Sequence, residues 1–378
     1  MKRLLYIDHD FHNKTKSSQF LEELLKSAYE VEVCNFDPYD KDPESAFECL
    51  KNKEFDILVL FQVTPDLERL KKNVSFKHAV FFPMYDASGG LDDDFWEQYR
   101  SFNIINFSRS LHERLLGLGL SSYYIQYFPK PAESLKYGNP DHVFFWQRLT
   151  DLNIDLVERL LRKIRVERIH VHKVLDPYQT FSEPSLAIAG KIKYSVWFDT
   201  REEMLRVMES CALYIAPRLY EGIGMSFLEA MAMGRCVIAP DSPTMNEYIV
   251  HGKNGLLYNY HKPKPIKARR IEKIQRNAYE YMKEGYARWT RDKYKILDWL
   301  EAPLRQDDWR RIKKQKKYQN IKIYLLFGFL PLLVLREKAY KRYYDLFGFL
   351  RILKSRKKET EMIFYLLGII PVWKSKLA

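Results

Sequence analysis

Two glutamates eight residues apart, Glu221 and Glu229, flank the glycines of the stretch EGIGMSFLEAMAMG. An apolar run at 212–217 predicts a buried strand just before them, and a helix is expected to begin near Met225. The backbone amides of the loop would then lie at a helix N-terminus, where N–H groups and the helix dipole attract phosphate. The two carboxylates can accept hydrogen bonds from hydroxyl groups on either side of that phosphate, which suits a sugar, a diphosphate and a ribose in series. The loop residues expected to line the phosphate are Gly222, Ile223, Gly224, Met225 and Ser226.

The elements that must position these residues form two series of the same kind. Short apolar runs alternate with helix-like segments, which predicts two tandem doubly wound, Rossmann-like α/β domains at 1–130 and 131–303. Strands are expected at 3–8, 31–36, 55–61, 78–84, 102–107 and 123–128, and then at 142–148, 167–174, 193–198, 212–217, 236–240 and 255–258. Helices are expected at 17–29, 44–52, 92–99 and 108–116, and the segment 271–300 is expected to close the second domain or return to the first. Open parallel sheets bind ligands at the carboxyl ends of their strands, so we expect the ligand in the cleft between the domains.

The positive charge is concentrated at the C-terminal end. The chain of 378 residues has a net charge of +13, and residues 305–378 contain 19 Lys and Arg against 6 Asp and Glu. The preceding residues are therefore neutral, which argues against a nucleic-acid enzyme with a basic cleft and favours an anionic surface as the partner of the tail. The four cysteines have no CxxC spacing, no run of 18 apolar residues occurs, and the first residues lack the apolar core of a signal peptide. We therefore expect a cytoplasmic protein.

The C-terminal segment 304–378 contains three repeats with a period of 20 residues. Gly328, Gly348 and Gly368 occupy the same position in each repeat, and aromatic, apolar and basic residues recur around them. One interpretation is a basic amphipathic tail that binds the interface of an anionic membrane, helped by the cluster RRIKKQKK at 310–317. The other is that the repeats stack on one another or on a second subunit, which would make the protein a homo-oligomer.

The stretch 212–259, which includes LEAMAMG, VIA and NGLL, resembles the donor-site signature of retaining glycosyltransferases of the GT-B fold, specifically family 4. That signature is a glutamate, seven residues and a second glutamate, and Glu221 and Glu229 match it. The resemblance implies that Glu221 contacts the transferred sugar and that Glu229 contacts the ribose of the nucleotide. The alternative is a pair of solvated glutamates at the start of a helix.

Arg148, in FFWQRL at the end of a predicted strand, resembles the family's arginine that neutralises the donor diphosphate. A guanidinium group suits this role because it binds phosphate through two parallel hydrogen bonds. The family usually has a lysine about five residues later, where this chain has Asn153. Arg218, just before the glutamate loop, is the candidate for the missing cation, with Lys191 and Lys193 as weaker candidates. An ordinary surface residue is the alternative interpretation of Arg218.

The first domain is expected to supply the acceptor side of the site. Tyr85 and Asp86 follow the fourth predicted strand, where the family often has a His–Asp pair, so Asp86 is retained and Tyr85 departs from the pattern. Asp86 could orient or deprotonate an acceptor hydroxyl, or it could cap the following loop. Lys14 and Lys16, after the first strand, could contact phosphate or an anionic acceptor. The sequence DHD at 8–10 is interpreted as a loop without a metal ion.

The resemblance implies a metal-independent hexosyltransferase that needs no cofactor beyond its nucleotide-sugar co-substrate. Retention of configuration without an obvious nucleophile fits a path in which diphosphate leaves and the acceptor attacks from the same face. By analogy with similar bacterial chains, the acceptor is expected to be a saccharide or lipid-linked saccharide of bacterial surface polysaccharide or lipopolysaccharide synthesis, at the inner face of the cytoplasmic membrane. The alternatives are a non-catalytic GT-B scaffold in a polysaccharide assembly complex and, less favoured, a phosphorylase or epimerase of the same fold.

Overall fold

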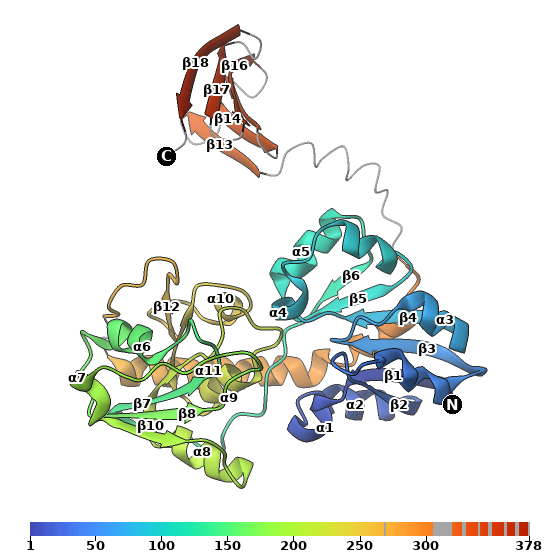
Figure 1. The fold of residues 1–378 in the computed structure, drawn as a ribbon, viewed down its shortest axis with the longest axis horizontal. Helices are drawn as coiled ribbons and strands as arrows, with labels where there is room; N and C mark the ends of the chain where they lie inside the picture. The colour runs from blue at the N-terminus through green and yellow to red at the C-terminus, as the bar shows by residue number, and fades with distance from the viewer. Residues whose placement is uncertain are drawn as a thin grey trace. The chain divides into compact units, whose positions relative to one another are not determined.

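The computed structural model describes residues 1–267 and 270–304 and six segments of the C-terminal region, 320–326, 330–338, 341–346, 350–358, 361–366 and 370–376. These described residues form two six-stranded parallel sheets with helices on their faces, and a third six-stranded sheet that is antiparallel (Figure 1). Both parallel sheets belong to one compact unit, and the antiparallel strands belong to another. The predicted fold class, two tandem Rossmann-like domains, is confirmed.

The first sheet has the strand order β2-β1-β3-β4-β5-β6, and all its neighbouring strands are parallel. Its strands are β1 (Arg3–His9), β2 (Glu30–Phe36), β3 (Lys53–Phe61), β4 (Val74–Phe82), β5 (Asn103–Asn106) and β6 (Ser122–Tyr124). The central strands are almost wholly apolar because helices cover both faces of a parallel sheet, and Leu4, Leu5, Tyr6 and Ile7 of β1 are fully buried. All six strands lie where the sequence predicts them, with ends shifted by a few residues.

The helices around the first sheet are short. They are α1 (Phe11–Thr15), α2 (Gln19–Lys26), η1 (Pro43–Leu50), α3 (Leu67–Asn73), α4 (Tyr85–Ser88), η2 (Asp94–Tyr99) and α5 (Arg109–Gly117). The segments predicted as helices at 44–52 and 92–99 form η1 and η2, which are 3-10 helices, a geometry common in short connecting segments.

The second sheet has the order β12-β11-β10-β7-β8-β9 and is also parallel throughout. Its strands are β7 (Asn139–Gln147), β8 (Arg168–Lys173), β9 (Ile192–Ser195), β10 (Cys211–Ile215), β11 (Cys236–Pro240) and β12 (Leu256–Tyr258). Its helices are α6 (Ile154–Leu161), α7 (Leu186–Ala189), α8 (Arg201–Glu209), α9 (Met225–Ala232) and α10 (Met245–Tyr248). Because β10, β7 and β8 are neighbours in space, the loops that follow them meet at one edge of the sheet.

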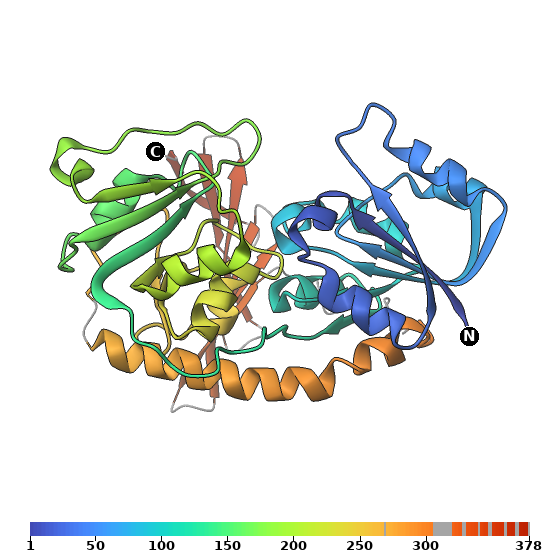
Figure 2. The same cartoon turned by 90° about the horizontal axis from the view of Figure 1, so that it is seen from below.

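Two C-terminal helices connect the domains. The long helix α11 (Ile271–Asp292) packs on α9, β10 and β11 of the second domain, and Figure 2 shows it running beneath both domains. Its Trp289 ring lies edge-on to Phe20 of the first domain, with ring centroids 5.8 Å apart. Helix α12 (Lys295–Leu300) then packs on β4 and β5 of the first sheet. The segment 271–300 therefore both closes the second domain and returns to the first.

A carboxylate of the second domain caps a helix of the first. Glu247 of α10 accepts hydrogen bonds from the backbone N–H groups of Arg109 (2.7 Å) and Ser110 (3.2 Å), at the start of α5. The hydroxyl groups of Ser108 and Tyr124 donate to the same carboxylate, at 3.0 and 3.1 Å. Negative charge is favoured at a helix N-terminus, so this contact stabilises the packing of the two domains against each other.

The antiparallel sheet repeats its strand pairing with the period of the sequence. Its strands, in the order β13-β14-β15-β16-β17-β18, are β13 (Asn320–Leu326), β14 (Leu330–Lys338), β15 (Lys341–Leu346), β16 (Leu350–Lys358), β17 (Glu361–Leu366) and β18 (Ile370–Lys376). Tyr324 pairs with Leu333, Tyr344 with Leu353 and Phe364 with Trp373, so each 20-residue repeat supplies two neighbouring strands in the same register. The aligned glycines Gly328, Gly348 and Gly368 and the basic cluster at 310–317 lie outside the described residues.

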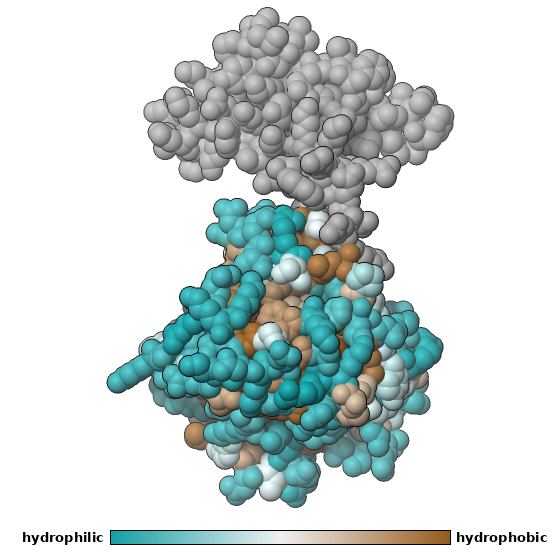
Figure 3. All heavy atoms as spheres, turned by 90° about the vertical axis from the view of Figure 1, so that its right-hand side faces the viewer, coloured by the Kyte–Doolittle hydropathy of each residue, from teal (hydrophilic) through white to brown (hydrophobic). Residues whose placement is uncertain are grey.

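The described residues include no helix that is long and apolar enough to cross a membrane. The face of the first compact unit drawn in Figure 3 is predominantly hydrophilic, as the neutral but charge-rich composition of these residues predicts.

Candidate active site

The glutamate loop connects β10 to α9, as the sequence predicts. Gly224 lies directly before Met225, the first residue of α9, and has a φ of +80°. A Cβ atom at Gly224 would lie only 2.0 Å from a ring carbon of Phe227, so only glycine fits this turn. The backbone amides that follow point along the start of an eight-residue helix, where N–H groups lack partners within the helix. A glycine in this conformation directly before a helix N-terminus is compatible with an anion bound at the loop.

Glu221 is the buried carboxylate of this loop, with 8% of its surface exposed. Burial raises its pKa to about 7; the neighbouring Arg218 opposes this rise and Asp86 adds to it. The backbone N–H of Glu221 donates to the carbonyl oxygen of Pro243 at 3.2 Å, which fixes the start of the loop. At neutral pH this side chain can either donate or accept a hydrogen bond.

Glu229 lies on α9 with its side chain 15% exposed, and it forms an ion pair with Arg201 at the first position of α8. Burial raises the pKa of Glu229, and Arg201 lowers it. Arg201 was not among the site residues predicted from the sequence. Its position was a signal, because a cation directly after the N-cap residue Thr200 is unfavourable for the helix dipole unless an anion pairs with it.

Two arginines meet at Asp176, which was also not among the site residues predicted from the sequence. Arg148 follows β7, and its Nε and Nη2 atoms lie 2.8 and 2.7 Å from Oδ1 of Asp176. Arg218 follows β10, and its Nη2 atom lies 2.7 Å from Oδ2. The signal for Asp176 was its place just beyond the carboxyl end of β8, the strand end where this fold binds ligands. The structure thus places Arg218 beside Arg148, in a cluster rather than alone on the surface.

The other candidate cations lie elsewhere. Lys191 and Lys193 are at the amino end of β9, the edge of the sheet opposite the glutamate loop. Asn153, at the position where the family usually has lysine, caps α6 by accepting a hydrogen bond of 3.1 Å from the N–H of Leu156.

The first domain reaches the glutamate loop through the segment after β4. A Cβ atom on Gly222 would lie 2.7 Å from Cβ of Met84 and 3.0 Å from Oδ1 of Asp86. Asp86 lies 3.5 Å from Nη1 of Arg218, although its side chain also accepts a hydrogen bond of 3.1 Å from the N–H of Ala87. Burial raises the pKa of Asp86, and Arg218 lowers it. Asp86 therefore both caps its own turn and faces the site.

Tyr85 and the two lysines of the first domain have different surroundings. The ring of Tyr85 lies 6.0 Å from that of Tyr220, the residue before Glu221, and 45% of Tyr220 is exposed. Lys14 lies over the ring of Trp197 in the loop after β9, with its Nζ atom 4.6 Å from the ring centroid. Lys16 ends α1 in a left-handed backbone conformation and is exposed. Among the described residues, no hydrogen bond, ion pair or cation–π contact joins either lysine to the glutamate loop.

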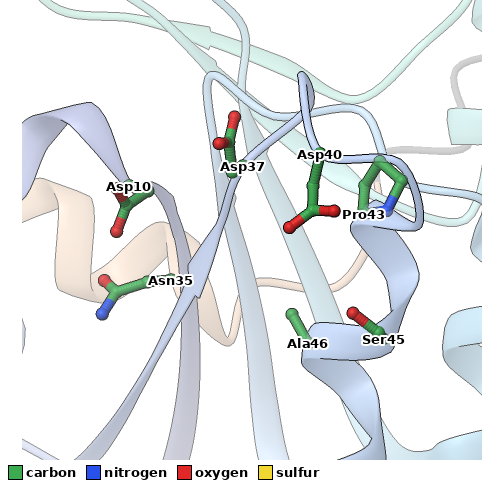
Figure 4. A pocket seen from close by; sticks show the side chains of 7 residues that line it. All are labelled: Asp10, Asn35, Asp37, Asp40, Pro43, Ser45 and Ala46. Carbon is green, nitrogen blue, oxygen red and sulfur yellow. The ribbon is translucent and has the colours of Figure 1, made fainter.

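A shallow acidic pocket of about 360 Å³ lies beside the carboxyl ends of β1 and β2 (Figure 4). Its lining includes Asp10, Asp37 and Asp40. Asp37 and Asp40 accept hydrogen bonds from backbone N–H groups two residues further along, at 2.9 and 3.3 Å, so they stabilise local turns. In the described part of the chain no group of three or more His, Cys, Asp or Glu side chains is arranged to hold a metal ion.

Comparisons with known proteins agree with this architecture. Residues 141–276, which contain the second sheet, match the family described as glycosyl transferases group 1. An uncharacterized glycosyltransferase of Methanocaldococcus jannaschii is 33% identical over 73 residues, which cover 19% of this chain and 21% of that protein. The chain thus spans about a fifth of the length of this curated relative.

Two solved structures share the fold. Anabaena HepE, solved in complex with UDP and glucose, aligns over 79% of this chain and 100% of its own with a TM-score of 0.50 and 13% identity. The sucrose-phosphate synthase of Thermosynechococcus elongatus aligns over 84% of this chain and 97% of its own, with a TM-score of 0.51 and 13% identity. The two parallel sheets therefore form the GT-B fold, and the comparisons support a relationship with the GT-B glycosyltransferases of group 1.

Proposed function

We propose that this protein is a retaining glycosyltransferase, similar to family 4, that transfers a hexose from a nucleotide-sugar donor to a saccharide acceptor. The observation that carries the proposal is the buried Glu221 before α9, with Arg148 and Arg218 held together at the neighbouring strand ends. A buried carboxylate beside paired guanidinium groups suits a ligand with hydroxyl groups next to a diphosphate.

The donor is assigned to the second domain. The diphosphate would bind the amides of residues 222–226 and the guanidinium groups of Arg148 and Arg218. Glu221 would contact the transferred sugar and Glu229 the ribose. UDP is the first nucleotide to test, because HepE was solved with UDP.

Catalysis in this proposal rests on stabilising the departing diphosphate. The two guanidinium groups and the loop amides supply positive charge to the leaving group, so a divalent cation is not required for this step. The acceptor hydroxyl then attacks from the face that the diphosphate leaves. Asp86 would orient or deprotonate that hydroxyl, and burial, which raises its pKa, makes it a stronger base.

The acceptor is assigned to the side of the first domain. Tyr85 and Tyr220 form an aromatic pair directly before Asp86 and Glu221, and aromatic rings with a polar tip suit the apolar face and hydroxyl groups of a sugar. We propose a saccharide or lipid-linked saccharide of bacterial surface polysaccharide or lipopolysaccharide synthesis. Lys14 and Lys16 would serve an anionic part of that acceptor.

A nucleotide-sugar panel tests the proposed function. We expect the matching donor, tested first among UDP-hexoses, to raise the midpoint of thermal unfolding by about 5 °C at saturating concentration. Release of nucleoside diphosphate, measured with EDTA present, reports turnover; the free hexose is the control. A thermal shift without turnover in the presence of any acceptor extract would favour the non-catalytic scaffold. No shift with any nucleotide sugar would contradict the proposed transferase.

We propose that the C-terminal segment 304–378 holds the enzyme at the anionic inner face of the cytoplasmic membrane. This segment contains 19 basic and 6 acidic residues. Each basic residue near an anionic surface contributes about 1 kcal/mol to the free energy of membrane binding, which supports the proposal. A chain ending at Pro303 should retain donor binding but lose sedimentation with vesicles containing phosphatidylglycerol.

The matched control for the membrane proposal is the full chain with the six basic residues of 310–317 changed to glutamine. This variant should need lower salt to bind the vesicles. If the shortened chain still sediments with them, the membrane assignment is wrong. The repeats instead join subunits if the full chain is an oligomer and the shortened chain a monomer in size-exclusion chromatography, and neither chain binds the vesicles.

A further inference from the structure

Arg148 and Arg218 lie together although two guanidinium groups repel each other. They come from loops after β7 and β10, and both bind one carboxylate from the loop after β8. We infer that Asp176 is a positioning residue that turns Arg218 toward Arg148, so that the two form a clamp for the donor diphosphate. The inference rests on the proposed function and adds a residue to it: Asp176 makes Arg218 the substitute for the missing lysine.

The topology of the second sheet allows this arrangement. Strand β7 lies between β10 and β8, so Asp176 and Arg218 approach from opposite sides of the strand that precedes Arg148. The backbone of Asp176 is also fixed, because its N–H donates to the carbonyl oxygen of Arg148 at 2.9 Å. All three side chains are largely buried. The exposed fraction is 18% for Asp176, 25% for Arg148 and 26% for Arg218. Their geometry is therefore constrained by packing as well as by charge.

Asp176 is needed to orient the side chain of Arg218, because other carboxylates nearby also attract this guanidinium group. Asp86 lies 3.5 Å from Nη1 of Arg218. The positive charge of Arg218 also attracts the carboxylate of Glu221 and lowers its pKa. Without Asp176, the repulsion from Arg148 and the attraction of these two carboxylates would draw Arg218 away from the diphosphate site. With Asp176 present, each arginine gives only part of its five N–H donors to the carboxylate and keeps others for phosphate.

A different role for Asp176 makes the opposite prediction. A carboxylate between two guanidinium groups occupies the place of an anionic ligand, so Asp176 could compete with the diphosphate. Removing its charge would then strengthen diphosphate binding, whereas removing a positioning residue weakens it. The sign of the change separates the two roles.

The experiment measures binding of UDP and of inorganic pyrophosphate by calorimetry to the full-length chain and its variants. We expect Asp176→Asn to weaken both ligands about tenfold, the loss of about one charge-assisted hydrogen bond. Arg218→Ala should weaken them by a similar factor, and the double variant should bind no more weakly than Arg218→Ala alone, because Asp176 acts through Arg218. The binding of UMP should weaken less than that of UDP, because UMP lacks the second phosphate. Asp176→Glu, which keeps the carboxylate, should bind both ligands more tightly than Asp176→Asn.

Asp141→Asn is the matched control, since it removes an aspartate that pairs with Arg165 at the amino end of the same sheet. This control should leave pyrophosphate binding unchanged. If Asp176→Asn binds pyrophosphate as tightly as the unaltered protein, or more tightly, the inference is wrong while the proposed function stands. If the unaltered protein binds pyrophosphate but neither UDP nor any nucleotide sugar, the clamp stands and the proposed function fails. Binding of none of these ligands overturns both.

Discussion

Glu221→Ala is expected to lower sugar transfer by about three orders of magnitude, the range for removing a group that acts in the transition state. Glu221 is buried in the loop before α9, next to Arg218 and Asp86, and the substitution deletes the carboxylate proposed to contact the transferred sugar. Binding of UDP, which lacks the sugar, should change little. The measurement is release of UDP from the matching UDP-hexose in the presence of acceptor. Transfer at the rate of the unaltered enzyme would contradict the assignment.

Glu221→Gln provides the control for folding, because it keeps the shape of the side chain and removes its charge. The pKa of Glu221 rises from 4.5 to about 7 on folding, so folding is increasingly opposed by the buried charge as pH rises from 4.5 to 7. Above pH 7 this cost amounts to about 3 kcal/mol. We therefore expect the glutamine variant to be more stable than the unaltered protein at pH 8 and to lose that advantage near pH 5, measured by thermal unfolding. An advantage that is equal at both pH values would show that the carboxylate is not desolvated.

The positions of the strands were predictable because each is a short apolar run between polar segments. The run at 236–240 coincides with β11, and the run at 212–217 locates β10 to within two residues. The glutamate loop was predictable for a related reason, since Gly222 and Gly224 mark a turn between a strand and a helix. Such local patterns do not depend on knowing which strands are neighbours.

The partners of the site residues were not predictable in this way. Asp176 meets Arg148 and Arg218 only because the sheet places β10, β7 and β8 side by side, and this order is not that of the chain. Arg201 reaches Glu229 and Glu247 reaches α5 through the same kind of contact between distant segments. A single sequence reveals such pairs only through local anomalies, such as a cation at the start of a helix or a polar residue just beyond a strand.

The same distinction applies to the C-terminal segment. The period of 20 residues was evident in the sequence, but a period does not say whether each repeat forms a helix or a pair of strands. The structure answers this through the pairing of Tyr324 with Leu333 and its two equivalents, each 20 residues further along.

Arg148→Ala is expected to lower transfer almost as much as Glu221→Ala, by about two to three orders of magnitude, because the departing diphosphate loses a guanidinium group that can bind it through two hydrogen bonds. It should also weaken UDP binding, whereas Glu221→Ala should not. The substitution does more than remove one positive charge from the phosphate site. Asp176 would keep its negative charge with Arg218 as its one remaining arginine partner, and this charge would repel the donor phosphates more strongly.

Arg148→Lys separates charge from geometry. Lysine keeps the positive charge but cannot match the Nε and Nη2 contacts of Arg148 with Asp176, so we expect activity between those of the alanine variant and the unaltered enzyme. Arg165→Ala is the matched control, because Arg165 also pairs with acidic residues of the second domain, but its side chain is 77% exposed at the amino end of the sheet. It should leave transfer unchanged. If Arg148→Ala and Arg165→Ala were equally active, the leaving group would have to be stabilised by the loop amides and Arg218 without Arg148.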